Sequence, residues 1–211
     1  MTYDAEKVLM GKQAVQIVEL YCDRCSRTYG TAPCTAAVGV TGTKKCYNTF
    51  ETCQDRANFD KTTAIYRFAT SRIDGLQAAG DPPIFPTVQN VDTAPTVLQP
   101  GKGLGVRATV NVRISDHPWT DAFDDPYQST RSFVADNQGS FWGKWLKRNR
   151  YYQWRKMVVR SGFLDSSGIY QSANFRTREY IIQSITGPDP SGTVTVAGVD
   201  PLKLADNDKA Q

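Results

Sequence analysis

Residues 106–114 read VRATVNVRI, and apolar and polar side chains alternate strictly along them. The apolar positions are the even-numbered ones, from Val106 to Ile114, and two arginines, a threonine and an asparagine occupy the others. Successive side chains of a β-strand point to opposite faces, so this pattern predicts a strand with one buried and one solvated face. The stretch therefore points to a β-sheet covered on one side.

Other segments rich in β-branched and aromatic residues extend this picture in both directions. Strands are predicted at residues 14–20, 62–70, 157–163, 175–186 and 193–199. The last two flank GPDPSG at residues 187–192, which predicts a hairpin with a longer loop. A short helix is expected near Glu6 and a second one over residues 141–149. Five prolines between residues 81 and 105 predict a connection rather than an element there. The predicted fold class is mainly β (α+β).

Composition excludes several classes of protein. The chain has 211 residues, of which 40% are hydrophobic and 22% charged, as in ordinary globular domains, and a net charge of +4. That length can form one domain or two small ones. No apolar run approaches the roughly 20 residues that span a bilayer. Since residues 1–13 lack the apolar core of a signal peptide, we expect folding in a reducing cytoplasm.

All five cysteines lie between residues 22 and 53, with the spacing C-x2-C-x8-C-x11-C-x6-C. Such clustering predicts a local site, and four thiolates would complete the ligand shell of an iron–sulfur cluster or of zinc. Structural zinc usually takes two close CxxC pairs, but only one is present here. The wide spacing of the other cysteines therefore weakly favours an iron–sulfur cluster over zinc. Reduced packing cysteines, or one disulfide with spectators, remain the alternative. The positions are Cys22, Cys25, Cys34, Cys46 and Cys53.

A basic and aromatic segment, FWGKWLKRNRYYQWRKMVVR, covers residues 141–160 and contains no acidic residue. Aromatic and basic side chains together are typical of nucleic-acid binding and of protein interfaces, and we favour an interface or core packing. The residues expected at an interface are Phe141, Trp142, Trp145 and Arg148. Acidic residues precede this segment, and we expect them to cap the helix and pair with its basic side chains. They are Asp116, Asp121, Asp124 and Asp125.

No catalytic site is predicted. His117 is the only histidine, and no nucleophile-elbow sequence accompanies it, so a turn residue is the better interpretation. The glycine-rich run at residues 101–105 lacks the spacing of a phosphate loop. We therefore expect that the protein is not an enzyme.

Several motifs together resemble one family. The early motifs are CSRTYGTAPCTA (25–36), GTKKCYNT (42–49), TCQD (52–55) and NF (58–59). The later ones are DPY (125–127), GSFWGK (139–144), RN (148–149) and DPLKLAD (200–206). The chain resembles, over nearly its whole length, the baseplate hub or tail-tip proteins of siphophage-like tails and gene transfer agents.

The resemblance implies a cofactor and its ligands. In this family the cysteine-rich segment is expected to hold an iron–sulfur cluster of the [4Fe-4S] type, as in the related tail-tip protein of phage lambda. The matched ligands are Cys25, Cys34, Cys46 and Cys53. Cys22 falls at a position where the family generally has another residue, so it is expected to be a spectator.

The resemblance also implies architecture and partners. It suggests a β-barrel-like tail-tube or hub domain formed by residues 1–20 and 61–211, with residues 21–60 as a metal-binding insertion. Three copies would form a ring between a distal tail protein and the central tip or fibre, with genome DNA passing through the lumen. The protein would be assembled in the host cytoplasm and reside in the virion tail tip. The chain would be the N-terminal part of a longer hub protein.

Two other classes compete with this interpretation. An iron–sulfur electron-transfer or sensor protein would use the same four thiolates for reversible reduction. A zinc-stabilised nucleic-acid-binding module would combine a zinc site with the basic segment at residues 141–160. Metal content and the salt dependence of binding separate these classes from a structural virion protein.

Overall fold

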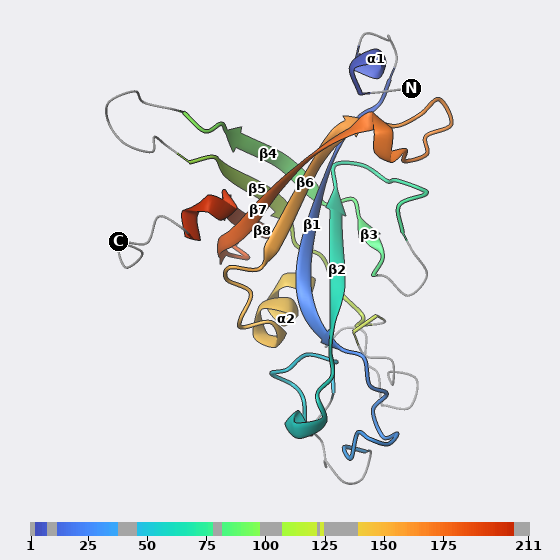
Figure 1. Cartoon of the computed structure of the whole chain (residues 1–211), viewed down its shortest axis with the longest axis vertical. Coiled ribbons are helices and arrows are strands. Elements are labelled where there is room, and N and C mark those ends of the chain that lie inside the picture. Colours follow the sequence, from blue (N-terminus) through green and yellow to red (C-terminus); the bar gives the residue numbers. More distant parts are fainter. Residues whose placement is uncertain are drawn as a thin grey trace. The chain divides into compact units, whose positions relative to one another are not determined.

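The structure is a computed structural model that describes residues 3–7, 12–37, 46–77, 82–97, 107–121, 123–124 and 139–204. Its elements are labelled in Figure 1. The described residues form two short α-helices, α1 (Tyr3–Lys7) and α2 (Phe141–Arg148). The strands are β1 (Ala14–Cys25), β2 (Lys61–Ala69), β3 (Ile84–Phe85), β4 (Val88–Ala94), β5 (Thr109–Ser115), β6 (Lys156–Phe163), β7 (Phe175–Thr186) and β8 (Thr193–Val199).

The eight strands form one mixed sheet in the order β3-β2-β1-β6-β7-β8-β5-β4. β2 and β3 pair in parallel. The following pairs are antiparallel: β1–β6, β6–β7, β7–β8, β8–β5 and β5–β4. The β7–β8 pair encloses residues 187–192, as the hairpin prediction requires. The prediction of a mainly β chain is confirmed.

The alternating stretch that indicated the fold lies in β5, between β4 and β8. Val110, Val112 and Ile114 are fully buried, whereas Asn111 and Arg113 are exposed. The strand therefore has the buried and solvated faces that its sequence predicts, while Val106 lies outside the described residues.

The prediction that residues 81–105 form only a connection is wrong for part of that range. β3 and β4 occupy it, with Pro86 in the short link between them and Pro95 directly after β4. β4 itself contains no proline, and it is the last strand of the sheet, with β5 as its neighbour. The prolines therefore delimit two edge strands, which is where sheets accept them.

The chain separates into two compact units. The sheet unit comprises residues 1–21, 65–115 and 153–211, and the cysteine unit comprises residues 22–64 and 116–152. Sequence analysis expected an insertion of residues 21–60, and the structure groups the segment containing α2 with the cysteines as well. No described helix is both long and apolar enough to cross a membrane.

The interiors of the two units differ in composition. Every buried valine, isoleucine, leucine and methionine among the described residues belongs to the sheet unit. One cluster of its core comprises Val15, Ile17, Ala69, Ile73, Leu164 and Phe175. In the cysteine unit the buried apolar side chains are cysteines, alanines and aromatic rings. The sheet unit therefore has the conventional aliphatic core.

One buried ionic network crosses three neighbouring strands of the sheet unit. Glu19 on β1 is 1% exposed, and its two carboxylate oxygens accept hydrogen bonds from Arg67 Nε on β2 and Arg160 Nη2 on β6, each at 3.1 Å. Tyr21 Oη donates to the same carboxylate at 3.1 Å. A buried carboxylate needs such partners, because it loses its hydration on folding.

Candidate metal centre

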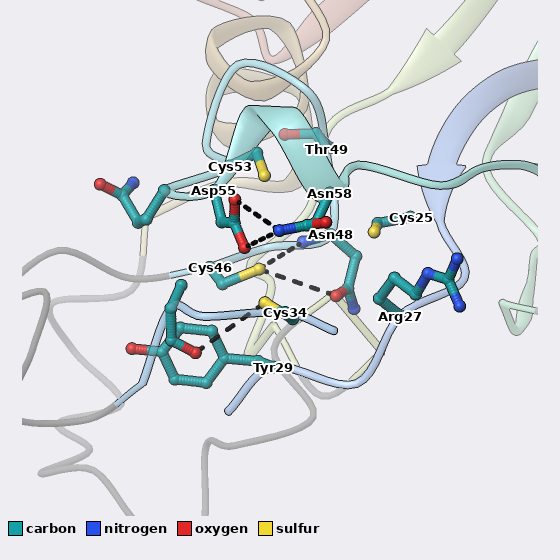
Figure 2. A pocket seen from close by; sticks show the side chains of 12 residues that line it. Cys25, Arg27, Tyr29, Cys34, Cys46, Asn48, Thr49, Cys53, Asp55 and Asn58 are labelled. Atoms are coloured by element: carbon teal, nitrogen blue, oxygen red, sulfur yellow. Dashed lines mark hydrogen bonds between the residues drawn. The ribbon is translucent and has the colours of Figure 1, made fainter. Parts of the chain in front are cut away.

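Four of the five cysteines line one pocket in the cysteine unit. Figure 2 shows Cys25, Cys34, Cys46 and Cys53 around the same space, although they are spread over 29 positions of the sequence (53 − 25 + 1). All other residues that line this pocket also belong to residues 27–58. The structure thus brings together the four cysteines that the family motifs match.

Cys25 is positioned by the sheet. It is the last residue of β1, which runs five residues further than the predicted strand at residues 14–20. Its backbone N–H donates to the carbonyl of Asn48 at 2.7 Å, and the next N–H, of Ser26, donates to the carbonyl of Asp60 at 2.8 Å. These bonds join the end of β1 to the segment that carries Cys46.

Cys34 and Cys53 lie on two turns that Asp55 connects. The Asp55 carboxylate accepts hydrogen bonds from the backbone N–H of Thr35 at 2.7 Å and from its hydroxyl at 2.9 Å. It also accepts from the side-chain amide of Asn58 at 3.0 and 3.2 Å. The Thr35 N–H first, and then these side-chain donors, hold the pKa of Asp55 below its usual value. Asp55 therefore remains ionised and fixes the spacing of the two turns.

Cys46 is held by its neighbour Asn48. The Asn48 backbone N–H donates to Cys46 Sγ at 3.4 Å, and the thiol lies 3.7 Å from Asn48 Oδ1. Asn48 adopts φ 59°, a left-handed conformation that asparagine tolerates better than most residues. This turn aims a backbone donor at the sulfur, which is the kind of contact that stabilises a thiolate ligand.

Burial and mutual repulsion oppose ionisation of the thiols when no cation is nearby. Burial raises the pKa of Cys46, and the thiols of Cys53, Cys34 and Cys25 raise it further. Burial likewise raises the pKa of Cys53, to which Cys25 and Cys34 contribute. Four thiolates gathered in one pocket therefore need a positively charged group, and a metal centre supplies that charge.

The donor set and the geometry of the pocket decide which metal group it could hold. Four thiols suit either a [4Fe-4S] cluster or a zinc ion. Among the described residues, no three histidine, cysteine, aspartate or glutamate side chains stand in the arrangement of a single-ion site. The pocket volume is about 10 Å³, so a cluster requires the thiols to turn outward. The donor chemistry fits both groups, and either one requires the side chains to adjust.

Cys22 is separate from this site. It lies on β1, is 4% exposed, and does not line the pocket. That Cys22 is a spectator stays a prediction, as does the alternative that the CxxC pair marks two ligands.

The four residues expected at an interface lie on α2, and all four are buried within the chain. Phe141, Trp142 and Trp145 are at most 2% exposed, and Arg148 is 9% exposed. Ser140 caps the helix, because its hydroxyl accepts from the Gly143 N–H at 3.4 Å. In the single chain these side chains form the interior of the cysteine unit.

The acidic block before α2 pairs with the basic side chains of the helix, as expected for Asp121 and Asp124. Asp121 binds Lys144 at 3.1 Å and Arg148 at 2.8 Å, and Asp124 lies 3.6 Å from Arg148. Asp116 accepts from the Trp142 N–H at 3.0 Å in the first turn of α2. Asp125 lies outside the described residues.

A contact that no sequence pattern predicts connects α2 to the cysteine loops. The Arg148 guanidinium stacks on the ring of Tyr47, 3.7 Å from its centroid, and Tyr47 directly follows Cys46. Burial lowers the pKa of Arg148, but the hydrogen bond and charge of Asp121 raise it more, so the arginine stays charged. No local pattern pairs an arginine with a tyrosine 101 positions earlier (148 − 47).

No protein-family model matches the chain, and the search of curated proteins found no match.

Proposed function

We propose that the chain is a structural virion protein, the hub of a phage tail tip or baseplate, and that its cysteine unit holds a structural iron–sulfur cluster. The observation that carries the proposal is the pocket formed by Cys25, Cys34, Cys46 and Cys53. These four cysteines are the ones that the hub motifs match, and the unmatched Cys22 does not line the pocket.

A structural role for the metal group is supported by what the cysteine unit lacks. None of its described valine, isoleucine, leucine or methionine side chains is buried, so aliphatic burial contributes little to its stability. Ligand bonds can replace that contribution, because a loop that closes around a metal gains its binding energy on folding. A cluster bound here would tie the end of β1 to the turns at residues 31–35, 46–49 and 50–53.

The protein's own groups would hold and protect the cluster. The four thiolates would bind it, the Asn48 N–H would donate to the sulfur of Cys46, and Asp55 would keep two ligand turns at a fixed spacing. The bound cluster would supply positive charge to the thiolates. A redox role has no separate support, since no described feature beside the pocket indicates a substrate or partner site for electron exchange.

Assembly and partners follow from the family resemblance. Three copies would form a ring that closes the tail tube, with a β-barrel-like hub domain built on the mixed sheet. The ring would join a distal tail protein to the central tip or fibre, and the tail tip of the virion would be its location. No catalytic turnover is part of this function.

A zinc-stabilised module is the second candidate. Four thiolates also complete the ligand shell of a single zinc ion, which is smaller than a cluster but likewise requires the thiols to adjust. This candidate uses the same four cysteines and predicts one zinc for each chain, without sulfide.

Oligomeric state and shape test the hub assignment directly. Anaerobically purified protein should sediment as a trimer in analytical ultracentrifugation and form rings in negative-stain electron microscopy. A monomer at all concentrations tested, with its metal retained, would remove the hub assignment while leaving the metal site intact.

A further inference from the structure

A second pocket of the cysteine unit lies between the loop at residues 50–56 and the end of α2. Its cavity volume is about 200 Å³. Three basic side chains line it, Arg56, Lys147 and Arg150, with two aromatic rings, Phe50 and Tyr151. Glu51 is the one acidic side chain in the lining. The pocket therefore combines an excess of positive charge with flat apolar surfaces.

The basic side chains of this pocket are available to a ligand. All three are exposed, and none makes an ion pair of 4 Å or less with any part of the chain that the structure describes. In contrast, Lys144 and Arg148 of α2 are paired with Asp121. The helix thus directs these two cations to an aspartate and leaves Lys147 at the pocket, where Arg150 and Arg56 lie outside the helix.

The aromatic rings are exposed to an unusual extent for their size. Phe50 is 41% exposed and Tyr151 is 68% exposed. Phe50 is also fixed in place, since Phe59 packs edge-on against it with ring centroids 5.3 Å apart and the Arg56 guanidinium lies 5.1 Å from its centroid. A ring held in this way can accept a stacked planar group without losing much side-chain freedom.

We propose that this pocket binds single-stranded nucleic acid, with the phosphates on the basic side chains and an unpaired base against Tyr151 or Phe50. Phosphate contacts need cations, and every base has a face that can stack on an aromatic ring. An acidic peptide would use the cations but has no need of two exposed rings, so the rings favour a nucleotide ligand. A volume of about 200 Å³ suits a local contact with one nucleotide rather than an enclosed ligand site.

This inference goes beyond the hub assignment and does not depend on it. It requires only that the loop at residues 50–56 and α2 are folded. Metal content and nucleic-acid binding are therefore measured independently on the same protein samples. Binding without iron or sulfide would sustain the inference and overturn the cluster, whereas an intact cluster without binding would overturn the inference alone.

The first experiment measures the affinity of the full chain for a fluorescein-labelled oligo(dT) 12-mer at several salt concentrations. Three phosphate contacts on a single strand predict a log–log salt slope of about −2, since each contributes about −0.7. Affinity should then fall about 20-fold between 50 and 200 mM salt. The double variant Lys147→Gln/Arg150→Gln should reduce that fall to about threefold, because one contact remains.

A matched control removes the same net charge elsewhere. Lys61→Gln/Arg72→Gln neutralises two exposed cations whose side chains are 61% and 88% exposed and that do not line the pocket. It should keep the affinity and salt slope of the unmodified chain within about twofold. Equal losses in both double variants would show attraction by overall charge and would overturn the inference.

Tyr151 separates stacking from charge. Tyr151→Leu should weaken oligo(dT) binding about tenfold, as expected for loss of one stacked base, while Tyr151→Phe should leave it unchanged. Inorganic phosphate should compete equally with oligo(dT) in the unmodified chain and in Tyr151→Phe. Circular dichroism and metal content of each variant confirm that the fold is retained.

Two further results would contradict the inference. One is the absence of oligo(dT) binding at 50 mM salt by folded protein. The other is tight binding of a poly-glutamate peptide that depends on Lys147 and Arg150 and that oligo(dT) fails to displace. The latter would assign the pocket to an acidic protein partner instead.

Discussion

The sheet unit and the cysteine unit of this chain are stabilised by different means. Buried valine, isoleucine, leucine and methionine side chains fill the sheet unit, and each contributes about 1.5–3 kcal/mol on burial. Nine polar or charged side chains are buried among the described residues of the whole chain. Six of them lie in the cysteine unit, together with buried aromatic rings and thiols. The six are Asn48, Thr49, Asp121, Asp124, Arg148 and Asn149. We infer that the sheet unit is stable without a bound group and that the cysteine unit needs one.

Loss of the metal group should therefore have the largest effect, and it should be confined to one unit. In Cys46→Ser, amide hydrogen exchange should become fast in the described cysteine-unit segments outside the sheet, residues 26–37, 46–60 and 139–152, while the sheet strands remain protected. The reason is that structural metal binding contributes on the order of 10 kcal/mol to the folding of small metal sites. Hydrogen exchange with mass spectrometry measures both units at once.

Cys22→Ser is the control for that result. It removes a buried thiol that does not line the pocket, so it should keep the metal and the exchange pattern of the unmodified chain. Loss of metal in Cys22→Ser together with its retention in Cys25→Ser would reverse our ligand assignment.

Removal of the arginine that joins α2 to the cysteine loops should be next in size. Arg148→Ala leaves Asp121 and Asp124 buried with less compensation and removes the ring contact with Tyr47. We expect a loss of about 3–5 kcal/mol in the free energy of unfolding of the cysteine unit, as for other broken buried pairs. Urea unfolding followed by the fluorescence of Trp142 and Trp145 measures it.

Arg150→Ala is the matched variant, because it removes an exposed arginine two positions later. A surface substitution of this kind should change the free energy of unfolding by no more than about 0.5 kcal/mol. Equal effects of the two variants would mean that the Arg148 contacts do not support the cysteine unit.

The ionic network of the sheet unit allows a test in which only the sheet unit, and not the cysteine unit, should lose stability. Glu19→Gln leaves Arg67 without its carboxylate, and the expected loss is about 3 kcal/mol, at the low end for buried pairs because Arg160 keeps some contact with solvent. The loss should appear in the sheet unit and leave metal content unchanged. Metal release in Glu19→Gln would show that the two units do not behave separately.

Glu179→Gln supplies the comparison within the same sheet. Glu179 pairs with Lys156, and both side chains are largely exposed, so the change in the free energy of unfolding should stay below about 1 kcal/mol. Thermal unfolding at pH 7 distinguishes the two substitutions. A larger loss of stability in Glu179→Gln than in Glu19→Gln would contradict the view that the buried network stabilises the sheet unit.

The smallest effect concerns the pH dependence of the β7–β8 loop. The Ser191 hydroxyl, followed by the Thr193 and Ser191 backbone N–H groups, lowers the pKa of Asp189. A lowered pKa stabilises the fold above the unfolded-state value, about 3.9, and that contribution is lost as pH falls through the folded-state value. Asp189→Asn should therefore flatten the decline of Tm below about pH 4. An equally steep decline of Tm at acidic pH in the variant and in the unmodified chain would contradict this prediction.

The sequence predicted the sheet unit far better than the cysteine unit. Alternation in β5 and the β-rich segments of β6, β7 and β8 are local signals. β6, β7 and β8 lie within one residue of their predicted bounds, whereas β5 begins at Thr109, three residues after the predicted start at Val106. β4 was missed because the surrounding prolines were interpreted as excluding a strand, whereas an edge strand can lie between them.

The grouping of four cysteines in one pocket agrees with the motifs of the hub resemblance, whereas what the pocket binds stays a prediction. Family motifs selected the four cysteines that line the pocket and excluded Cys22. The packing of residues 116–152 with the cysteine region, and the Arg148–Tyr47 stack, have no local signal in the sequence. Such contacts between distant segments depend on tertiary packing that periodicity does not encode.

The proposed function requires that the four pocket thiols hold a structural iron–sulfur cluster. The most direct test is the iron, zinc and acid-labile sulfide content of anaerobically purified protein, with its visible absorbance spectrum. We predict about four irons and four sulfides for each chain, as a [4Fe-4S] cluster with four cysteine ligands requires. One zinc without sulfide, or no metal at all, would contradict the claim.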